Sequence, residues 1–396
     1  MRSTGLVFFA DDSQAVHLLP LTYTMPPEEI RVGILTLAQK WAMVWNRRSL
    51  ALSVNSRLLP DEKLLESVAN LRDGQGLSYQ DLPLLRVHGT GAEDAGVLEI
   101  EGIEWIPWVH EVNMIHYPED IFLKNGREIK ADLERMHRAG GEWVWPSWQE
   151  RTSNDSHTAV YHPEQVWVHP TAKVSAAVLD ATDGPIWVGA HAEIMPGALV
   201  KGPMALGEHA TLKMGAKIYG DTTVGPFCKV GGEVSNSVMH SYSNKGHDGF
   251  MGNSVIGRWC NWGADTNNSN LKNNYEPVKL WDIATSRFRS TGLTFCGLVM
   301  ADHAKCGINT MFNTGTVIGV GANVFGGGFV RQFVPCFGWG GIHGMETFRF
   351  DKFCETTERV MQRRSIALDE TEKQKLMEVF EQSAYQRTWE KSASND

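Results

Sequence analysis

Apolar residues recur at every sixth position through the middle of the chain. The run contains no polar residue and consists of Val188, Ile194, Val200, Leu206, Leu212, Ile218, Val224 and Val230. An amphipathic helix repeats every 3.6 residues and a half-buried strand every two, so neither produces this spacing. A six-residue period is typical of a parallel β-helix, in which each flat face turns one aliphatic side chain inward.

A second register lies two positions before the first and is mostly small. Its members are Ile186, Ala192, Ala198, Met204, Ala210, Ala216, Thr222 and Cys228. Small residues fit near the tight corners of a coil, and the glycines at Gly189, Gly207, Gly225 and Gly231 relax the backbone there. The two registers together predict a left-handed parallel β-helix of hexapeptide repeats.

The same frame extends on both sides of this run. Val168 and Val174 precede it, and the frame returns as Phe250, Ile256 and Trp262 and later as Met300, Cys306, Phe312, Ile318, Val324 and Val330. We expect a solenoid from Val166 to Arg331 with about six coils, inside a domain of residues 160–342. Residues 233–248 and 265–292 are polar and out of frame, so we expect both to leave the prism as loops.

The two ends of the chain have a different pattern of apolar and polar residues. Residues 1–155 alternate a short apolar run, 5–9, with helix-like stretches at 34–45 and 60–71, which favours an α/β domain. Residues 343–396 repeat with helical period, and we expect this C-terminal extension to pack on the open end of the solenoid.

Composition excludes several classes of partner. The formal net charge is −9 and no long run of Lys or Arg occurs, which argues against a nucleic-acid ligand. No apolar stretch approaches the roughly 20 residues that span a bilayer, and the N-terminus does not resemble a secretory signal, so we expect a cytoplasmic protein without a membrane partner. The six cysteines lack CxxC spacing and are interpreted as small buried side chains.

Three segments carry a resemblance to a known family: LLPLTYTMPPEEIRVGILTLAQKW near the N-terminus, and SNKGHDGFMGNSVIG followed by GADTNNSNLKNN within the solenoid. With the order of the two domains, they resemble the GlmU-like family, which joins N-acetylglucosamine-1-phosphate uridyltransferase and glucosamine-1-phosphate acetyltransferase. The closer similarity is to a divergent branch described as sugar nucleotidyltransferases. The resemblance implies a transferase of sugar-nucleotide synthesis, and similar solenoids form trimers with the acyl site between neighbours, so we expect a homotrimer.

In the acetyltransferase half, the resemblance implies that His247 is the general base, acting with acetyl-coenzyme A as acyl donor. This role is chemically sensible, because an aminosugar ammonium must lose a proton before it attacks a thioester, and imidazole titrates in the right range. A main-chain N–H near Ala264 would meet the oxyanion, and Asn270 could bind the sugar. Phe250 matches the aromatic position that follows the Gly-His pair.

Two lysines near these motifs are candidates for a phosphate of the acceptor or of coenzyme A, Lys245 and Lys272, although lysines beside loops are commonly only solvated. The sequence also departs from the family. Leu271 stands where the family has a tyrosine, and the phosphate-binding Lys and Arg have no clear equivalent in residues 231–239. The identity of the acceptor therefore stays open.

The N-terminal half departs further, because the Gly-Thr-Arg loop that normally holds the nucleoside triphosphate is missing. Asp11 and Asp12 follow the first apolar run and could hold Mg²⁺ for phosphoryl transfer, with Arg31 and Lys40 as nucleotide-binding cations. A degenerate domain retained for its structural role is an equal alternative.

Three hypotheses about function follow. The first is an enzyme with a sugar-1-phosphate nucleotidyltransferase-like domain and a coenzyme-A-dependent sugar acyltransferase-like solenoid. The second is a catalytically degenerate trimeric scaffold or regulatory binding protein. The third is nucleotidyl transfer alone on a structural solenoid. The sequence names neither the sugar, the nucleotide nor the acyl group.

Overall fold

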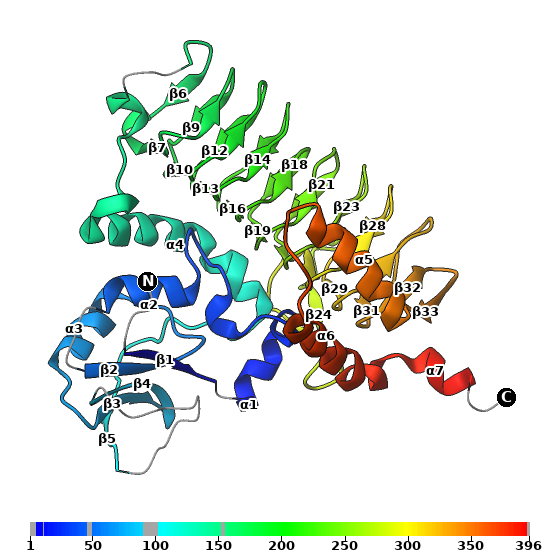
Figure 1. Ribbon diagram of the computed structural model, residues 1–396, viewed down its shortest axis with the longest axis horizontal. Coiled ribbons are helices and arrows are strands. Elements are labelled where there is room, and N and C mark those ends of the chain that lie inside the picture. Colours follow the sequence, from blue (N-terminus) through cyan, green and yellow to red (C-terminus); the bar gives the residue numbers. More distant parts are fainter. Residues whose placement is uncertain (1–4, 11, 46–49, 90–101, 152–154, 394–396) are drawn as a thin grey trace.

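A computed structural model describes residues 5–10, 12–45, 50–89, 102–151 and 155–393 of the chain. An α/β unit with a small sheet, in blue and cyan, lies beside a long parallel β-helix in green and yellow (Figure 1). Three helices in orange and red pack against the far end of the β-helix. The predicted fold class is confirmed.

The N-terminal unit has a mixed sheet of order β1-β2-β4-β3-β5. Its strands are β1 (Leu6–Phe9), β2 (Leu50–Asn55), β3 (Gln75–Tyr79), β4 (Leu82–Gly89) and β5 (Glu104–Pro107). Its helices are α1 (Asp12–Ala15), α2 (Leu37–Val44), α3 (Glu62–Asn70) and α4 (Pro118–Ala139). Thr36 and Asp61 cap α2 and α3 by accepting hydrogen bonds from backbone N–H groups of the first turn, which explains where both predicted helices begin.

The solenoid has three faces, of which the longest is a nine-stranded parallel sheet. Its strands are β7 (Val166–Val168), β10 (Ile186–Val188), β13 (Met204–Leu206), β16 (Thr222–Val224), β19 (Val238–Met239), β22 (Val255–Ile256), β26 (Leu298–Met300), β29 (Thr316–Ile318) and β31 (Phe333–Val334). The solenoid therefore has about nine coils, and the expectation of six was too low.

The second face is a six-stranded sheet that two later strands extend. It comprises β6 (Ala159–Tyr161), β9 (Val178–Asp180), β12 (Leu199–Lys201), β15 (Lys217–Ile218), β18 (Glu233–Ser235) and β21 (Phe250–Gly252), followed by β23 (Asn267–Asn268) and β28 (Met311–Phe312). The third face starts as β8 (Lys173–Val174), β11 (Glu193–Ile194), β14 (Thr211–Leu212), β17 (Lys229–Val230) and β20 (Asn244–Lys245). Bridges through Asn261 continue it to β27 (Lys305–Cys306), β30 (Asn323–Val324), β32 (Gly338–Gly341) and β33 (Gly344–Thr347).

Coils were missed because the six-residue step shortens in places. Val234 follows Val230 by four residues and Met239 follows Val234 by five, yet all three side chains are buried in the core. Residues 233–248 therefore stay in the solenoid as β18, β19 and β20, and the expectation that they leave as a loop is wrong. The same shortening makes Met251 the inward residue, in place of the predicted Phe250.

The second expected excursion does leave the prism. After β23 the chain forms the antiparallel hairpin β24 (Lys279–Asp282) and β25 (Arg287–Ser290) before it returns at β26. Val278 and Leu280 of this segment are buried in a cluster with Val299 and Val317, which project outward from the nine-stranded sheet. The insertion thus covers part of that sheet.

The N-terminal unit covers the rest of the same sheet, which α4 crosses. Trp187, Ala205 and Val238 project outward from it and are all buried. Gly126 of α4 lies against Asp221, where a Cβ would collide with the carboxylate, so a glycine is needed for this close approach. The outward side of the nine-stranded sheet is consequently an internal surface of the chain.

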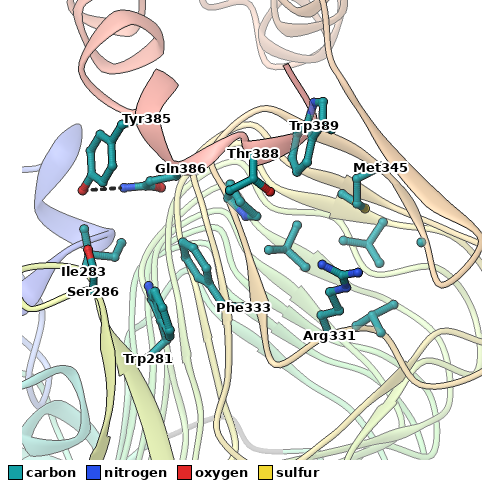
Figure 2. A pocket seen from close by; sticks show the side chains of 15 residues that line it. Trp281, Ile283, Ser286, Arg331, Phe333, Met345, Tyr385, Gln386, Thr388 and Trp389 are labelled. Carbon is teal, nitrogen blue, oxygen red and sulfur yellow. Dashed lines mark hydrogen bonds between the residues drawn. The ribbon is translucent and has the colours of Figure 1, made fainter. Parts of the chain in front are cut away.

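The C-terminal extension consists of α5 (Phe350–Gln362), α6 (Glu370–Gln382) and α7 (Thr388–Ala393). Phe353 and Leu376 bury their side chains against Val320 and Phe337 of the last coils. A cavity of about 300 Å³ remains between the hairpin, the last coil and the start of α7 (Figure 2). Among the residues described, no helix has the length and apolar character needed to cross a membrane.

Candidate active site

The Gly-His motif forms a corner of the solenoid between β20 and β21. His247 is exposed there, and its ring has no hydrogen-bond partner within the described part of the chain. Met251 follows Lys245 by six residues, so the corner keeps the regular step and is not the extruded loop that the polar sequence suggested. A rigid frame therefore presents an imidazole to solvent at the edge between two faces.

Lys245 supports this corner from inside. It stands next to Val230 at an inward position of β20 and is only 2 % exposed. Its Nζ donates to the carbonyl oxygen of Gly231 at 2.8 Å and to that of His247 at 3.1 Å. Burial lowers the pKa of its ammonium group to about 8. The expected phosphate contact does not agree with this position, because the side chain points into the solenoid.

The corner of the next coil lies directly against the Gly-His corner. The Asp265 N–H donates to the Asp248 carbonyl oxygen at 3.1 Å, and the Ala264 carbonyl accepts from Asn309 at 2.8 Å. The N–H of Ala264 itself has no acceptor among the described residues. A half-buried main-chain donor without a partner thus lies one coil from His247, as an oxyanion site would need.

Phe250 and Asn270 come together over Gly252. A Cβ at Gly252 would lie 2.5 Å from the Phe250 ring and 2.7 Å from the Asn270 amide nitrogen. That amide nitrogen donates to the Asn253 side-chain oxygen at 2.8 Å, which fixes its orientation. The glycine therefore creates the space in which an aromatic ring and an amide lie side by side.

Two further asparagines hold these elements in place. The Asn267 side-chain oxygen accepts from the Phe250 N–H at 2.7 Å, and that of Asn268 accepts from the Gly252 N–H at 3.1 Å. Asn268 also donates to the Gly252 carbonyl oxygen at 3.1 Å and is buried at an inward position. The Asn268 side-chain amide thus makes the two hydrogen bonds to Gly252 that the backbone of a neighbouring strand would otherwise make. Its place six residues after Trp262 was the available sequence signal for an inward amide.

Lys272 lies outside this arrangement. Its Nζ donates to the Pro277 carbonyl oxygen at 3.0 Å, within the segment that leads to the hairpin. Of the six residues expected around the acyl site, the structure thus places His247 and Ala264 on stacked corners of adjacent coils, and Phe250 and Asn270 beside Gly252 on the face that follows. Lys245 lies beneath them, and Lys272 is engaged in its own loop.

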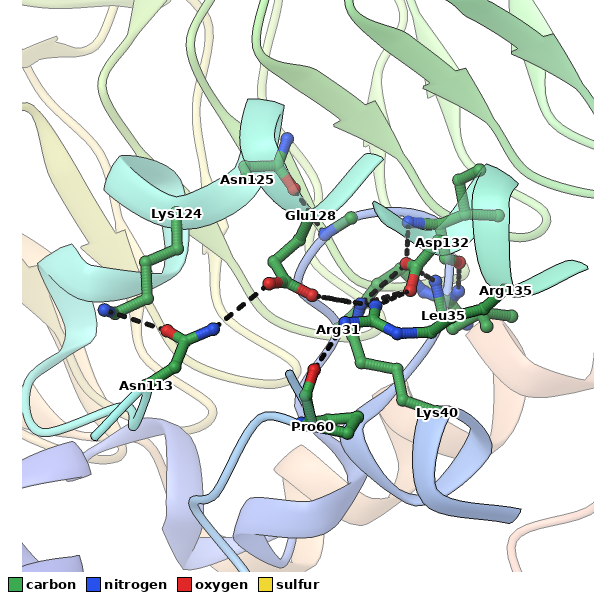
Figure 3. Close-up of polar contacts among 12 residues, drawn as sticks. Arg31, Leu35, Lys40, Pro60, Asn113, Lys124, Asn125, Glu128, Asp132 and Arg135 are labelled. Carbon is green, nitrogen blue, oxygen red and sulfur yellow. Dashed lines mark hydrogen bonds and ion pairs between the residues drawn. The ribbon is translucent and has the colours of Figure 1, made fainter. Parts of the chain in front are cut away.

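The two cations expected to bind nucleotide lie in the part of the N-terminal unit that faces the solenoid, Lys40 buried and Arg31 half-buried (Figure 3). Lys40 is fully buried, and its Nζ lies 3.0 Å from Glu128 and 2.6 Å from Asp132. Arg31 donates to the Ile34 carbonyl, and its backbone N–H lies 3.4 Å from His240 of the solenoid. Neither cation is free for a phosphate in this structure, which corrects the expectation for both.

The same network explains how the N-terminal unit is held. Arg135 lies 3.0 Å from Glu128 and 2.6 Å from Asp132, so two cations face two carboxylates inside the protein. Burial raises the pKa of Glu128, but Lys40 and Arg135 outweigh this effect and lower it to about 2. A buried ion-pair network of this kind fixes geometry, because removal of one partner leaves an uncompensated charge.

The expected metal ligands cannot be placed. Asp11 and the side chain of Asp12 lie outside the described residues. Within the described residues, no group of three His, Cys, Asp or Glu side chains could hold a metal ion.

Comparison with known proteins matches the N-terminal unit to one family and a part of the chain to two relatives. Residues 6–52 and 43–139 match the family described as "Sugar nucleotidyl transferase". The "Bifunctional protein GlmU" of Methanocaldococcus jannaschii is 33% identical over 87 residues, which cover 22% of this chain and 21% of that protein. GlmU of Methanococcus vannielii is 32% identical over 95 residues, covering 23% and 22%. The aligned part spans about a fifth of these relatives, and the matches confirm the resemblance to the GlmU-like family as a divergent one.

Solved structures with a similar shape include the polySia-specific acetyltransferase NeuO. It is 14% identical, with a TM-score of 0.30, and the alignment covers 52% of this chain and 94% of NeuO. A likeness at this level carries no argument about substrate or mechanism.

Proposed function

We propose that this protein transfers an acyl group from coenzyme A to the amino group of a sugar phosphate or nucleotide sugar. The observation that carries the proposal is that His247 and the unpartnered Ala264 N–H lie on stacked corners of adjacent coils, and that the Phe250–Asn270 pair lies over Gly252 on the strand that follows. An exposed base, a fixed hydrogen-bond donor and an aromatic and amide platform are the three groups that acyl transfer to a sugar amine needs.

In the proposed mechanism His247 transfers protons and the Ala264 N–H stabilises the oxyanion. The imidazole of His247 takes a proton from the acceptor ammonium, and the free amine attacks the thioester carbonyl carbon. The oxygen of the tetrahedral intermediate carries the developing charge and accepts a hydrogen bond from the Ala264 N–H. As the carbon–sulfur bond breaks, the nitrogen releases its second proton to solvent and the His247 imidazolium returns the first to the leaving thiolate, so that an amide and free coenzyme A result.

A homotrimer is the assembly that we propose. Exposed apolar side chains project from the six-stranded sheet and its extension, whereas the nine-stranded sheet is covered by the chain itself. These side chains are Tyr161, Leu199, Tyr219, Met311 and Phe329, between 37% and 58% exposed. Exposed apolar side chains of this size on a flat sheet, here interspersed with Lys217 and Glu233, are typical of an interface between copies. His247 lies at the edge of this face, so a neighbouring copy would form the second wall of the acyl site.

The direct test is release of thiol from acetyl-coenzyme A by the purified full chain. A panel of aminosugar 1-phosphates, aminosugar 6-phosphates and nucleotide-linked aminosugars serves as acceptors, with the corresponding N-acetylated sugars as blocked controls. We expect thiol release only with a free amine, and an acetylated product by mass spectrometry. Absence of release with every amine would contradict the proposal.

Nucleotidyl transfer is the second candidate, and the family match over the N-terminal unit favours it. The positions of Lys40, buried against two carboxylates, and of Arg31, half-buried, weigh against it, because a triphosphate needs accessible cations. Mg²⁺ at Asp11 and Asp12 belongs to this candidate only. Release of pyrophosphate from a nucleoside triphosphate and a sugar 1-phosphate, dependent on Mg²⁺, would establish it.

The scaffold hypothesis predicts neither thiol nor pyrophosphate release from a protein that is folded and trimeric. We place the protein in the cytoplasm, because the proposed substrates are small phosphorylated metabolites and acyl-coenzyme A.

A further inference from the structure

The cavity at the far end of the solenoid is separate from the acyl site and shares no residue with it. Its floor is the end of the β-helix core, where Val324, Val330 and Val334 are buried. Its walls are aromatic: Trp281 and Phe333 stack with ring centres 5.0 Å apart, and Trp389 closes the other side (Figure 2). A volume of about 300 Å³ is at the lower end of the range for small-molecule sites.

Two polar groups at this cavity lack a partner among the residues that the structure describes. Gln386 is buried, and its amide nitrogen donates to Tyr23 and Tyr385, both at 3.1 Å, but its Oε1 atom accepts no hydrogen bond. Arg331 lines the cavity with a guanidinium group that forms no ion pair or hydrogen bond. A buried acceptor without a donor costs about 1–3 kcal/mol, so it is rarely left without a role.

The aromatic wall is held in place by contacts outside the cavity. The Trp389 indole nitrogen donates to Thr347 at 2.9 Å, and Trp281 packs edge-on against Phe288 of the hairpin, with ring centres 5.1 Å apart. The rings therefore keep the cavity open instead of collapsing into it, as is expected of a preformed binding site.

We infer that this cavity binds a small aromatic carboxylate. The carboxylate pairs with the Arg331 guanidinium at the exposed edge of the cavity, and the ring lies among Trp281, Phe333 and Trp389. Pairing of a guanidinium with a carboxylate is the strong, directional contact in this arrangement. Aromatic walls favour a flat ring, because offset and edge-on ring pairs add to the gain from burial.

The test uses three matched probes with the full chain, by calorimetry or ligand-observed NMR: 4-hydroxyphenylacetate, phenylacetate, which lacks the hydroxyl donor, and 4-hydroxyphenylacetamide, which lacks the charge. We expect both carboxylates to bind more tightly than the amide. Arg331→Gln should weaken both carboxylates about tenfold or more and leave the amide unchanged. Because Arg331 is an exposed side chain, this variant should fold normally.

Two further variants keep the inference falsifiable. Val330→Phe adds a ring to the cavity floor and should abolish binding of all three probes. Arg359→Gln on the exposed side of α5, where the arginine pairs only with Glu355 at 3.5 Å, is the control and should change nothing. The inference is overturned if no probe binds at about 10 mM, or if binding is the same in Arg331→Gln and Val330→Phe as in the unmodified protein.

Discussion

The ammonium nitrogen of Lys245 lies 3.1 Å from the main-chain carbonyl oxygen of His247. One buried side chain therefore determines where the backbone of the proposed base can lie. Lys245 touches no exposed surface of the site, so it acts as a positioning residue, and its effect on catalysis passes through the Gly-His corner.

Replacing Lys245 with methionine should lower kcat while the fold persists. Without the two hydrogen bonds the corner can shift, and a displacement of about 1 Å at a catalytic group can cost on the order of 100-fold in rate. Stability should not fall with it. The pKa of Lys245 is lowered from 10.5 to about 8, so the charged form opposes folding below about pH 8. Steady-state kinetics and thermal melts of the variant at pH 7 measure the two effects.

Lys305→Met is the matched control. Lys305 is half-buried, its Nζ donates to the carbonyl oxygen of His303 at 2.9 Å, and desolvation lowers its pKa to about 8 as well. It makes no contact with the Gly-His corner. Equal loss of kcat in both lysine variants would mean that Lys245 has only a general structural role.

Gly252→Ala should impair acceptor binding. The new methyl group would enter the space between the Phe250 ring and the Asn270 amide and force them apart. We expect KM for the aminosugar to rise about tenfold, with KM for acetyl-coenzyme A unchanged. Gly246→Ala is the control, since a Cβ there meets no atom within 4 Å. An unchanged KM for the acceptor in Gly252→Ala would remove Phe250 and Asn270 from the proposed site.

Acid should destabilise the protein through the network around Glu128. The pKa of Glu128 is lowered from 4.5 to about 2, so its contribution to stability is complete above pH 4.5 and is lost as the pH falls toward 2. Glu128→Gln should cost about 3 kcal/mol at pH 7, because Lys40 and Arg135 are then incompletely paired. The free energy of unfolding of this variant should also fall less between pH 4.5 and pH 2 than that of the unmodified protein. Chemical denaturation at each pH measures this difference.

Glu134→Gln provides the comparison for this experiment. Its side chain is 68% exposed and lies 3.6 Å from Arg138, so its removal should change stability by less than about 1 kcal/mol. Between pH 4.5 and pH 2, the free energy of unfolding of this variant should fall by the same amount as that of the unmodified protein. If Glu128→Gln behaves in the same way, the network does not determine acid stability.

A charge on the six-stranded sheet should dissociate the proposed trimer. Leu199→Glu places a carboxylate in the exposed apolar row, and thiol release should fall together with the oligomer, because the acyl site would lose its second wall. Light scattering and activity measured on the same samples test this. Lys173→Glu, on the third face, should leave both unchanged; a stable trimer in Leu199→Glu would place the interface elsewhere.

The six-residue period predicted the solenoid because each inward position needs an apolar residue of similar size. The number of coils was underestimated because steps of four and five residues after Val230 and Val234 interrupt the six-residue spacing in the sequence. The strands of successive coils still pair in register there. Periodicity cannot detect this, since a parallel ladder pairs residues of successive coils whatever the number of residues in the corner.

The proposed acyl site depends on the same stacking of coils. Motif order pointed to His247, Ala264, Phe250 and Asn270, and stacking places the first two on adjacent corners and the last two beside Gly252. Burial, however, depends on which side of a strand a residue lies. Lys245 and Lys40 are polar in sequence and buried in the fold, so their roles could be assigned only after their carbonyl and carboxylate partners were known.

The most direct test of acyl transfer is thiol release from acetyl-coenzyme A by His247→Ala, compared with Asp248→Ala and the unmodified protein, each confirmed by light scattering to have the same oligomeric state. Both side chains are exposed on the same corner and both could accept a proton, so the pair of variants shows which of them is the base. We predict that His247→Ala loses at least about 100-fold in kcat while Asp248→Ala keeps most of it. Full activity in His247→Ala would contradict the assignment of His247 as the base.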